Sequence, residues 1–133
     1  MKKLYLTIIV TILFMACTFS TKEHVTGNYY LVSTVENSHA ISLSYYLEKE
    51  DAFVGVSPYG IKSADFDDNY IFLWRNTSNR RAVANEFNKE FYIVPICNNC
   101  QDYSKLDIIF GPYNKREFQT KLSELNVDKK IKW

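Results

Sequence analysis

The chain has 133 residues and a formal net charge of +1, with 16 basic and 15 acidic side chains. This length suits one domain, which can bury a core but cannot divide into two. Because the charges balance, the composition offers no broad basic face to nucleic acid or another polyanion. We therefore expect a single globular domain that does not bind nucleic acid.

The N-terminal residues have the layout of a secretory signal. Lys2 and Lys3 precede an apolar run from Leu4 to Met15, which ends at Ala16-Cys17. A basic start, a short apolar stretch and a small residue before the cleavage point define such signals. This ending resembles the lipobox of bacterial lipoproteins. In that family the sulfur of the cysteine receives a diacylglycerol. The resemblance implies cleavage after Ala16 and acylation of Cys17.

Two alternatives explain the same residues. A transmembrane helix needs about 20 apolar residues, and the run from Leu4 to Phe19 is shorter and broken by threonines. A plain secretory signal cut after Ala16 is the closer alternative, since it also requires a small residue before the cut. Ala16-Cys17 at the end of a short apolar run is the more specific combination. The sequence therefore favours a lipid anchor, which holds a protein stably on a membrane.

Export places the protein in the bacterial cell envelope. Residues 1–16 are the predicted signal peptide, residues 17–27 the acylated N-terminus and a polar tether, and residues 28–133 the globular domain. Thr18, rather than an aspartate, follows the acylated cysteine. In the sorting rule of some bacteria with two membranes, this favours the outer membrane. The membrane itself is therefore the expected partner at this end of the chain.

The domain is expected to be α+β, an antiparallel β-meander of about six short strands with one C-terminal helix packed on the sheet. Ten tyrosines and nine phenylalanines fit strands, because aromatic side chains pack well on a pleated surface. A β-sandwich with an appended helix is the alternative. Apolar runs bounded by turn residues predict strands at residues 28–35, 41–47, 53–56, 61–66, 70–75, 91–96 and 106–110.

The clearest helix signal lies near the C-terminus. Asn114 is a predicted N-cap, and Glu117 completes a capping-box pair with it. Tyr113 and Phe118 are spaced as a hydrophobic staple across this start. Phe118 also begins an apolar stripe at helical spacing. Asn126 is expected to end the helix.

Cys97 and Cys100 lie in a polar loop between two apolar runs. In the compartment that export implies, disulfides form and persist. A thioredoxin-type redox pair would need a helix after the first cysteine, and a zinc site would need two further ligands, which His24 and His39 do not supply nearby. We expect a small structural disulfide or free thiols, ahead of redox or metal chemistry.

Asp65, Asp67 and Asp68 cluster at a predicted turn, where Asp65-x-Asp67-x-Asn69 matches the first half of a calcium-binding loop. The match then fails, because Tyr70 stands where that loop requires glycine. A carboxylate-rich hairpin turn is the ordinary interpretation. We expect no cofactor and no bound metal.

Arg80 and Arg81 are adjacent in a long polar stretch from Asn76 to Glu90. Long loops in compact domains are often functional, so these arginines are the candidate contacts for acidic groups of a partner. A solvated loop without a partner is the more ordinary explanation of the same residues.

The chain contains no recognisable catalytic motif. It has no Gly-x-Ser-x-Gly, no His-Glu-x-x-His and no phosphate-binding glycine loop. His24 lies in the predicted tether and His39 at a predicted turn, and neither position suits pre-organised catalysis. We therefore expect a protein that is not an enzyme.

Four stretches of the mature chain carry a family resemblance: Gly27-x-Tyr29-Tyr30-Leu31-Val32, Phe91-Tyr92-Ile93-Val94, Ile109-Phe110-Gly111-Pro112 with Phe118, and Ser123-Glu124-Leu125-Asn126-Val127. They resemble a family of small bacterial lipoproteins, the domain-of-unknown-function family 3997. They cover most of the mature chain, although Asn126 stands where the family usually has glycine. The resemblance implies a fold and a cellular address, and it carries no activity.

The sequence thus predicts a lipid-anchored interaction module of the cell envelope, which contacts an unknown protein or an envelope polymer. The alternative is a small envelope enzyme or metal-binding protein that uses Asp65, Asp67 and Asp68 with Cys97 and Cys100. The two differ in geometry, because the alternative requires these carboxylates and cysteines to meet in one pocket.

Overall fold

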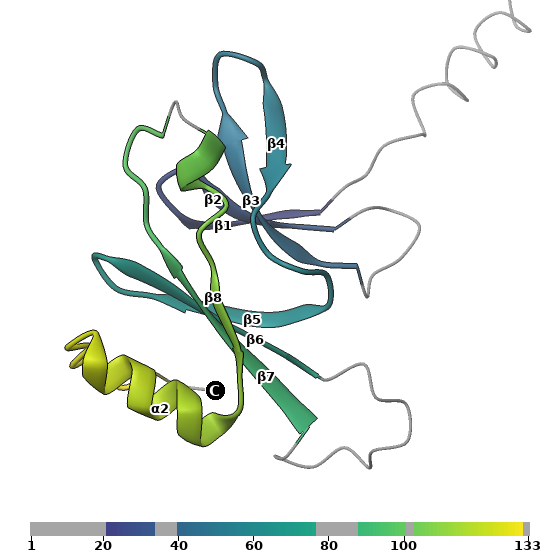
Figure 1. The fold of residues 1–133 in the computed structure, drawn as a ribbon. Coiled ribbons are helices and arrows are strands. Elements are labelled where there is room, and N and C mark those ends of the chain that lie inside the picture. The colour runs from purple at the N-terminus through teal and green to yellow at the C-terminus, as the bar shows by residue number, and fades with distance from the viewer. Residues whose placement is uncertain (1–20, 34–39, 77–87, 101–102, 132–133) are drawn as a thin grey trace, which may run out of the picture.

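The described residues form two antiparallel sheets and a C-terminal helix (Figure 1). The computed structural model describes residues 21–33, 40–76, 88–100 and 103–131. Within these ranges, sheet A has the order β1-β2-β3-β4 and sheet B has the order β5-β6-β7-β8. The α+β class and the meander order are confirmed. The described strands number eight and divide between two sheets, instead of about six in one.

The strands are short and the helix follows the last of them. Sheet A consists of β1 (Lys22–Thr26), β2 (Tyr29–Val32), β3 (Ser42–Leu47) and β4 (Ala52–Gly55). Sheet B consists of β5 (Ile61–Phe66), β6 (Tyr70–Asn76), β7 (Lys89–Pro95) and β8 (Phe110–Tyr113). A 3₁₀ turn, η2 (Tyr103–Lys105), precedes β8, and α2 (Lys115–Glu124) follows it. In the described ranges, no helix is both long enough and apolar enough to cross a membrane.

Sheet B lies between sheet A and α2 because its central strands are apolar on both faces. On β6, Ile71 and Leu73 join the core against sheet A, while Phe72 and Trp74 join the core against α2. Side chains of a strand alternate between its two faces, so a strand buried on both sides is apolar throughout. The same alternation runs through Phe91–Val94 on β7. Figure 1 shows the resulting layers, with α2 on the side of sheet B away from sheet A.

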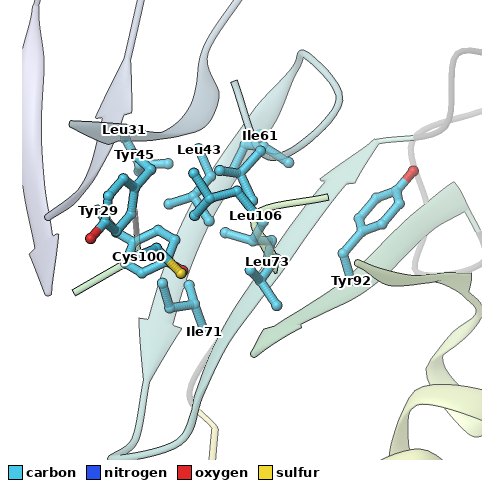
Figure 2. Packing of buried hydrophobic residues seen from close by; sticks show 12 residues of the cluster. Tyr29, Leu31, Leu43, Tyr45, Ile61, Ile71, Leu73, Tyr92, Cys100 and Leu106 are labelled. Atoms are coloured by element: carbon cyan, nitrogen blue, oxygen red, sulfur yellow. The ribbon is translucent and has the colours of Figure 1, made fainter. Parts of the chain in front are cut away.

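Sheet A packs its inner face against sheet B, and on its outer face Ser42 and Ser44 of β3 are also buried. Tyr29 and Leu31 on β2 and Leu43 and Tyr45 on β3 are all buried and alternate with outward side chains. Figure 2 shows them packed against Ile71 and other side chains of sheet B. Burying one such side chain contributes about 1.5–3 kcal/mol. This inner core therefore holds the two sheets together.

Helix α2 begins with the predicted capping box. Asn114 Oδ1 accepts the N–H of Glu117 at 2.9 Å, and Glu117 Oε2 accepts the N–H of Asn114 at 2.9 Å. Phe118 is buried against sheet B, with its ring centroid 4.9 Å from that of Phe91. The chain leaves the helix at Asn126, whose φ of 53° suits the left-handed position after a helix end. The predicted start, buried face and end of this helix are confirmed.

Strand β1 occupies residues that the sequence suggested as a tether. Lys22–Thr26 pairs with β2, so the fold begins before Asn28. Only Val25 and Thr26 of this strand are half-buried, and its other side chains are exposed. An edge strand with so little burial has the polarity of a linker, which explains the difference.

The sequence predicts the last strand at residues 106–110, but β8 lies further along the chain. It runs from Phe110 to Tyr113 and includes Gly111 and Pro112. Proline is tolerated because β8 is an edge strand, where a missing N–H breaks no ladder on the open side. Leu106 is buried, but it lies before the strand, directly after η2.

Candidate functional site

The predicted acidic turn is a hydrogen-bonded hairpin turn. Asp67 Oδ1 accepts the backbone N–H of Asn69 at 2.8 Å and that of Tyr70 at 2.7 Å, which closes the connection between β5 and β6. Asp68 is exposed beside it. Among the residues that the structure describes, no three His, Cys, Asp or Glu side chains are arranged to hold a metal ion. The Asp67 carboxylate therefore stabilises the turn.

Asp65 connects sheet B to the chain that follows α2. Its Oδ1 accepts from Lys129 Nζ at 2.5 Å and from the N–H of Phe66 at 2.8 Å. Lys129 Nζ also donates to the carbonyl of Phe66 and lies 5.4 Å from the centroid of its ring. A partly exposed ion pair of this kind contributes about 0–1 kcal/mol. Its role is to hold the C-terminal segment against β5.

Cys97 and Cys100 are joined by a disulfide. Cys100 is buried in the core between the sheets. The hydroxyl of Tyr29 accepts the N–H of Cys97 at 3.1 Å and donates to the carbonyl of Pro95 at 3.4 Å. Burial raises the pKa of Tyr29, while its hydrogen bond from the Cys97 backbone acts in the opposite direction. The disulfide loop is thus fastened to sheet A and serves the packing of the two sheets.

A hollow of about 390 Å³ lies between the disulfide loop and the turn that joins β3 to β4. Its described lining mixes aromatic, amide and charged side chains with one cysteine, among them Tyr45, Tyr46, Glu48, Asn99 and Cys100. The acidic turn adjoins the disulfide loop through its backbone, since the N–H of Ile96 donates to the carbonyl of Asn69 at 2.8 Å. The residues that line the hollow nevertheless include none from Asp65–Asp68. The carboxylates and cysteines named by the enzyme or metal-binding alternative do not share this pocket.

A half-buried ion pair holds the crossing between the sheets. Arg75 Nε donates to Glu90 Oε2 at 2.7 Å, and the hydroxyl of Tyr92 donates to the same oxygen at 2.9 Å. Arg75 also donates to the carbonyl of Tyr59 at 2.9 Å, in the loop between β4 and β5. Burial, and then the hydrogen bond to Glu90, raise the pKa of Tyr92. All three polar groups are engaged with one another, which indicates a structural clamp.

The outer face of sheet A carries a row of aromatic rings. Tyr30 on β2 lies 5.1 Å from His24 on β1 and 5.5 Å from Phe53 on β4, measured between ring centroids. Phe53 lies 5.1 Å from Tyr46 on β3, and Lys22 Nζ is 4.7 Å from the Phe53 centroid. Tyr30, Tyr46 and Phe53 are half-buried, and Lys22 and His24 are exposed. We call these five residues the aromatic face.

The register of sheet A explains how the rings meet. His24, Tyr30, Ser44 and Gly55 lie opposite one another across the four strands. Because Ser44 is small, the ring of Phe53 can reach toward Tyr30 over it. Ser44 is only 5% exposed although it lies on the outer face. The rings are therefore packed in place by the sheet itself.

Tyr46 connects the aromatic face to the hollow. Its hydroxyl donates to Asp51 Oδ1 at 2.5 Å, and this hydrogen bond is the main reason that the pKa of Tyr46 is raised. Tyr46 also lines the hollow beside the disulfide loop. The aromatic face and the hollow thus form one continuous surface at the β3–β4 hairpin.

The two sheets differ in what covers them. Helix α2 packs on β7 and β8 of sheet B, whereas sheet A packs its inner face against sheet B through their shared core. In the described part of the chain, the outer face of sheet A has no covering helix.

The aromatic face could not be predicted from the sequence alone. The sequence places His24 in the predicted tether, and the register that brings Phe53 near Tyr30 exists only in the folded sheet.

Cys17, Arg80 and Arg81 lie outside the described residues. The acylation of Cys17 and the contact of the two arginines with a partner therefore stay predictions.

The fold and its surfaces define a small α+β domain of two meander sheets with one docked helix, whose distinctive surface is the aromatic face. Residues 26–133 match the family model described as "Protein of unknown function (DUF3997)", and the chain belongs to this family. The resemblance to family 3997 is thereby confirmed, while the assignment to bacterial lipoproteins stays a prediction. No curated protein and no solved structure matches the chain.

Proposed function

We propose that this chain is a lipid-anchored protein of the bacterial cell envelope that works as a binding module rather than as an enzyme. The observation that supports binding is the aromatic face, on the side of sheet A that no helix of the described residues covers. Tyrosine and phenylalanine side chains are rigid and contact apolar and polar groups, so they are common anchors of interfaces. The proposed partner is a protein or polymer of the envelope.

The lipid anchor is proposed from Ala16-Cys17 at the end of the signal-like segment. Strand β1 begins at Lys22, only a few residues after Cys17. An extended chain spans at most about 3.6 Å per residue, so the fold would lie within about 20 Å of the acylated cysteine. The aromatic face begins on β1, next to this anchor, so it would lie close to the membrane surface. In a cell with two membranes, the proposed membrane is the outer one.

Acylation is tested by mass and by fractionation. The N-terminal peptide of the chain expressed in a bacterium should begin at Cys17 and carry the mass of the added acyl chains. A Cys17→Ser variant should lose both the added mass and its membrane association. An unmodified peptide, together with a Cys17→Ser variant that still fractionates with membrane, would refute the anchor.

Binding is tested by capture from solubilised envelope. A Tyr30→Ser, Phe53→Ser double variant removes two rings of the aromatic face, and Tyr59→Ser is the matched control, because Tyr59 is 68% exposed and lies off that face. We expect components enriched by the parent chain to be lost with the double variant and kept with the control. Equal capture by both variants, with unchanged thermal unfolding, would mean that the aromatic face does not bind.

The same capture tests the two arginines. An Arg80→Ala, Arg81→Ala variant changes no residue of the aromatic face. If the captured components depend on the arginines and not on the rings, the binding site includes the segment of the chain between β6 and β7. If they depend on the rings alone, the arginines have no part in binding.

A further inference from the structure

The two sheets end in four edge strands, which differ in how their open sides are protected. β1 and β5 carry charged side chains and lie beside each other, and β8 contains Pro112. Charges, proline and coverage by a neighbouring element all prevent an edge strand from pairing with another chain. In the described part of the chain, β4 (Ala52-Phe53-Val54-Gly55) carries neither a charge nor a proline, and β3 is the only strand that pairs with it. Figure 1 shows the β3–β4 hairpin projecting from one end of the molecule.

The ladder with β3 shows which backbone groups of β4 point to the open side. The N–H of Val56, just after β4, donates to the carbonyl of Leu43 at 2.8 Å. Backbone groups alternate in direction along an antiparallel strand, so those of Val54 also point toward β3. The N–H and carbonyl groups of Phe53 and Gly55 therefore point away from the sheet.

This edge is complementary to itself. When two copies of β4 lie antiparallel about a two-fold axis at Val54, Phe53 of each copy lies opposite Gly55 of the other. Such opposed residues exchange both of their backbone hydrogen bonds. A Cβ built on Gly55 meets no atom within 4 Å, so the backbone of a neighbouring strand can approach this position.

We propose that β4 pairs antiparallel with β4 of a second copy of this chain. The pairing joins two copies of sheet A into one continuous sheet, with the two aromatic faces on the same side. The acidic hairpin tips, which carry Glu48 and Asp51, fall at opposite ends of the pair, so they do not repel each other.

The strength of this pairing depends on the lipid anchor, and this step rests on the proposed function. β4 is only four residues long, so the shared surface is smaller than the roughly 1,200 Å² of stable complexes. Two copies anchored to the same membrane have a high effective concentration, and weak contacts then become populated. The pair is therefore expected on membranes and not in dilute solution.

The pairing is tested by cysteine cross-linking of the full chain in phospholipid vesicles. The two Val54 residues of the pair face each other about 4.5 Å apart between Cα atoms, within reach of a disulfide. Ala52→Cys is the matched control, because the two Ala52 residues are about 14 Å apart at about 3.4 Å per residue. We expect Val54→Cys to cross-link on mild oxidation and Ala52→Cys not to.

A second variant removes one hydrogen bond per copy between the paired chains and leaves the ladder to β3 intact. Gly55→Pro in the Val54→Cys chain deletes an N–H that points to the open side. It should reduce cross-linking by about tenfold or more, since each copy loses one hydrogen bond. Gly55→Ala keeps the N–H and should retain the cross-link. Thermal unfolding of both variants checks that the fold is kept.

The outcomes separate this proposal from the lipid anchor. Equal or absent cross-linking of Val54→Cys and Ala52→Cys in vesicles, in a chain whose mass shows acylation, overturns the pairing and leaves the anchor standing. An unacylated chain that cross-links through Val54→Cys at high concentration supports the pairing without the anchor. If Gly55→Pro instead releases a different protein from a chain that never cross-links, the edge binds another protein's strand and the self-pairing is wrong.

Discussion

Gly111 lies where β8 comes close to β7. Its φ is 120°, a value that side chains rarely allow, and a Cβ there would be 2.6 Å from the carbonyl oxygen of Phe91. The obstructing atom is backbone in a central strand, so it cannot move aside. By contrast, Gly55 has a Cβ position with no atom within 4 Å. Positive φ and close contact with β7 therefore require glycine at position 111, whereas no contact within the fold requires it at position 55.

A Gly111→Ala substitution should destabilise the fold by about 2–4 kcal/mol, from backbone strain together with overpacking. Gly55→Ala is the control and should change the free energy of unfolding by less than about 1 kcal/mol. Denaturant unfolding of both variants measures the difference. Equal effects would show that β8 shifts to accommodate the methyl group, contrary to the close approach seen at Phe91.

At the level of single elements, α2 depends on signals that lie next to each other in the sequence. Asn114 and Glu117 cap its start through reciprocal hydrogen bonds, and Asn126 takes the left-handed conformation after its end. These signals act within one helical turn, so they can be recognised without the rest of the molecule.

An Asn114→Ala substitution should cost about 1 kcal/mol, the usual value of a lost N-cap. Asn126→Gly should be neutral or slightly stabilising, because glycine adopts a positive φ without strain. Both values come from denaturant unfolding of the full chain. A loss at Asn126→Gly as large as that at Asn114→Ala would mean that Asn126 has a further role in packing.

The same locality explains how much of the fold could be predicted. The strands expected at residues 61–66 and 70–75 match β5 and β6 within one residue, because alternation and the acidic turn both act over short distances. The partition into two sheets entered only as the alternative prediction, a β-sandwich with an appended helix, and the sequence did not decide for it. It depends on the crossing after β4, where Val56 still bonds to Leu43 while Ile61 already bonds to the carbonyl of Ile41. That crossing is a long-range contact with no local signature.

The aromatic face could not be predicted from the sequence for a related reason. Its rings come from four strands, and His24 belongs to a strand with too little burial to be recognised. Phe53 reaches toward Tyr30 across β3, where the small side chain of Ser44 lies opposite Tyr30. Composition indicated many aromatic residues, but only the register shows that these gather on one surface.

At the scale of the whole molecule, sheet B takes part in both hydrophobic cores, one shared with sheet A and one shared with α2. Leu73 is fully buried on the side of sheet A, and its neighbour Phe72 is fully buried on the side of α2. Phe118 extends the second core from the helix. Since adjacent residues of one strand face opposite cores, neither core can open without disturbing the ladder that the other requires. We therefore expect the sheets and the helix to unfold as one cooperative unit.

Leu73→Ala and Phe118→Ala test this cooperativity from the two sides of sheet B. Each should lower the free energy of unfolding by about 2–5 kcal/mol, through lost burial and the cavity left behind. If the unit is cooperative, both variants shift a single transition, and far-ultraviolet and near-ultraviolet circular dichroism follow the same curve. If Phe118→Ala instead melts the helix signal first and leaves the aromatic signal of sheet A unmoved, then α2 is a separately docking element. In that case the sheets would be stable without it, and the inner core of Tyr29, Leu43 and Leu73 would be sufficient to hold the aromatic face in place.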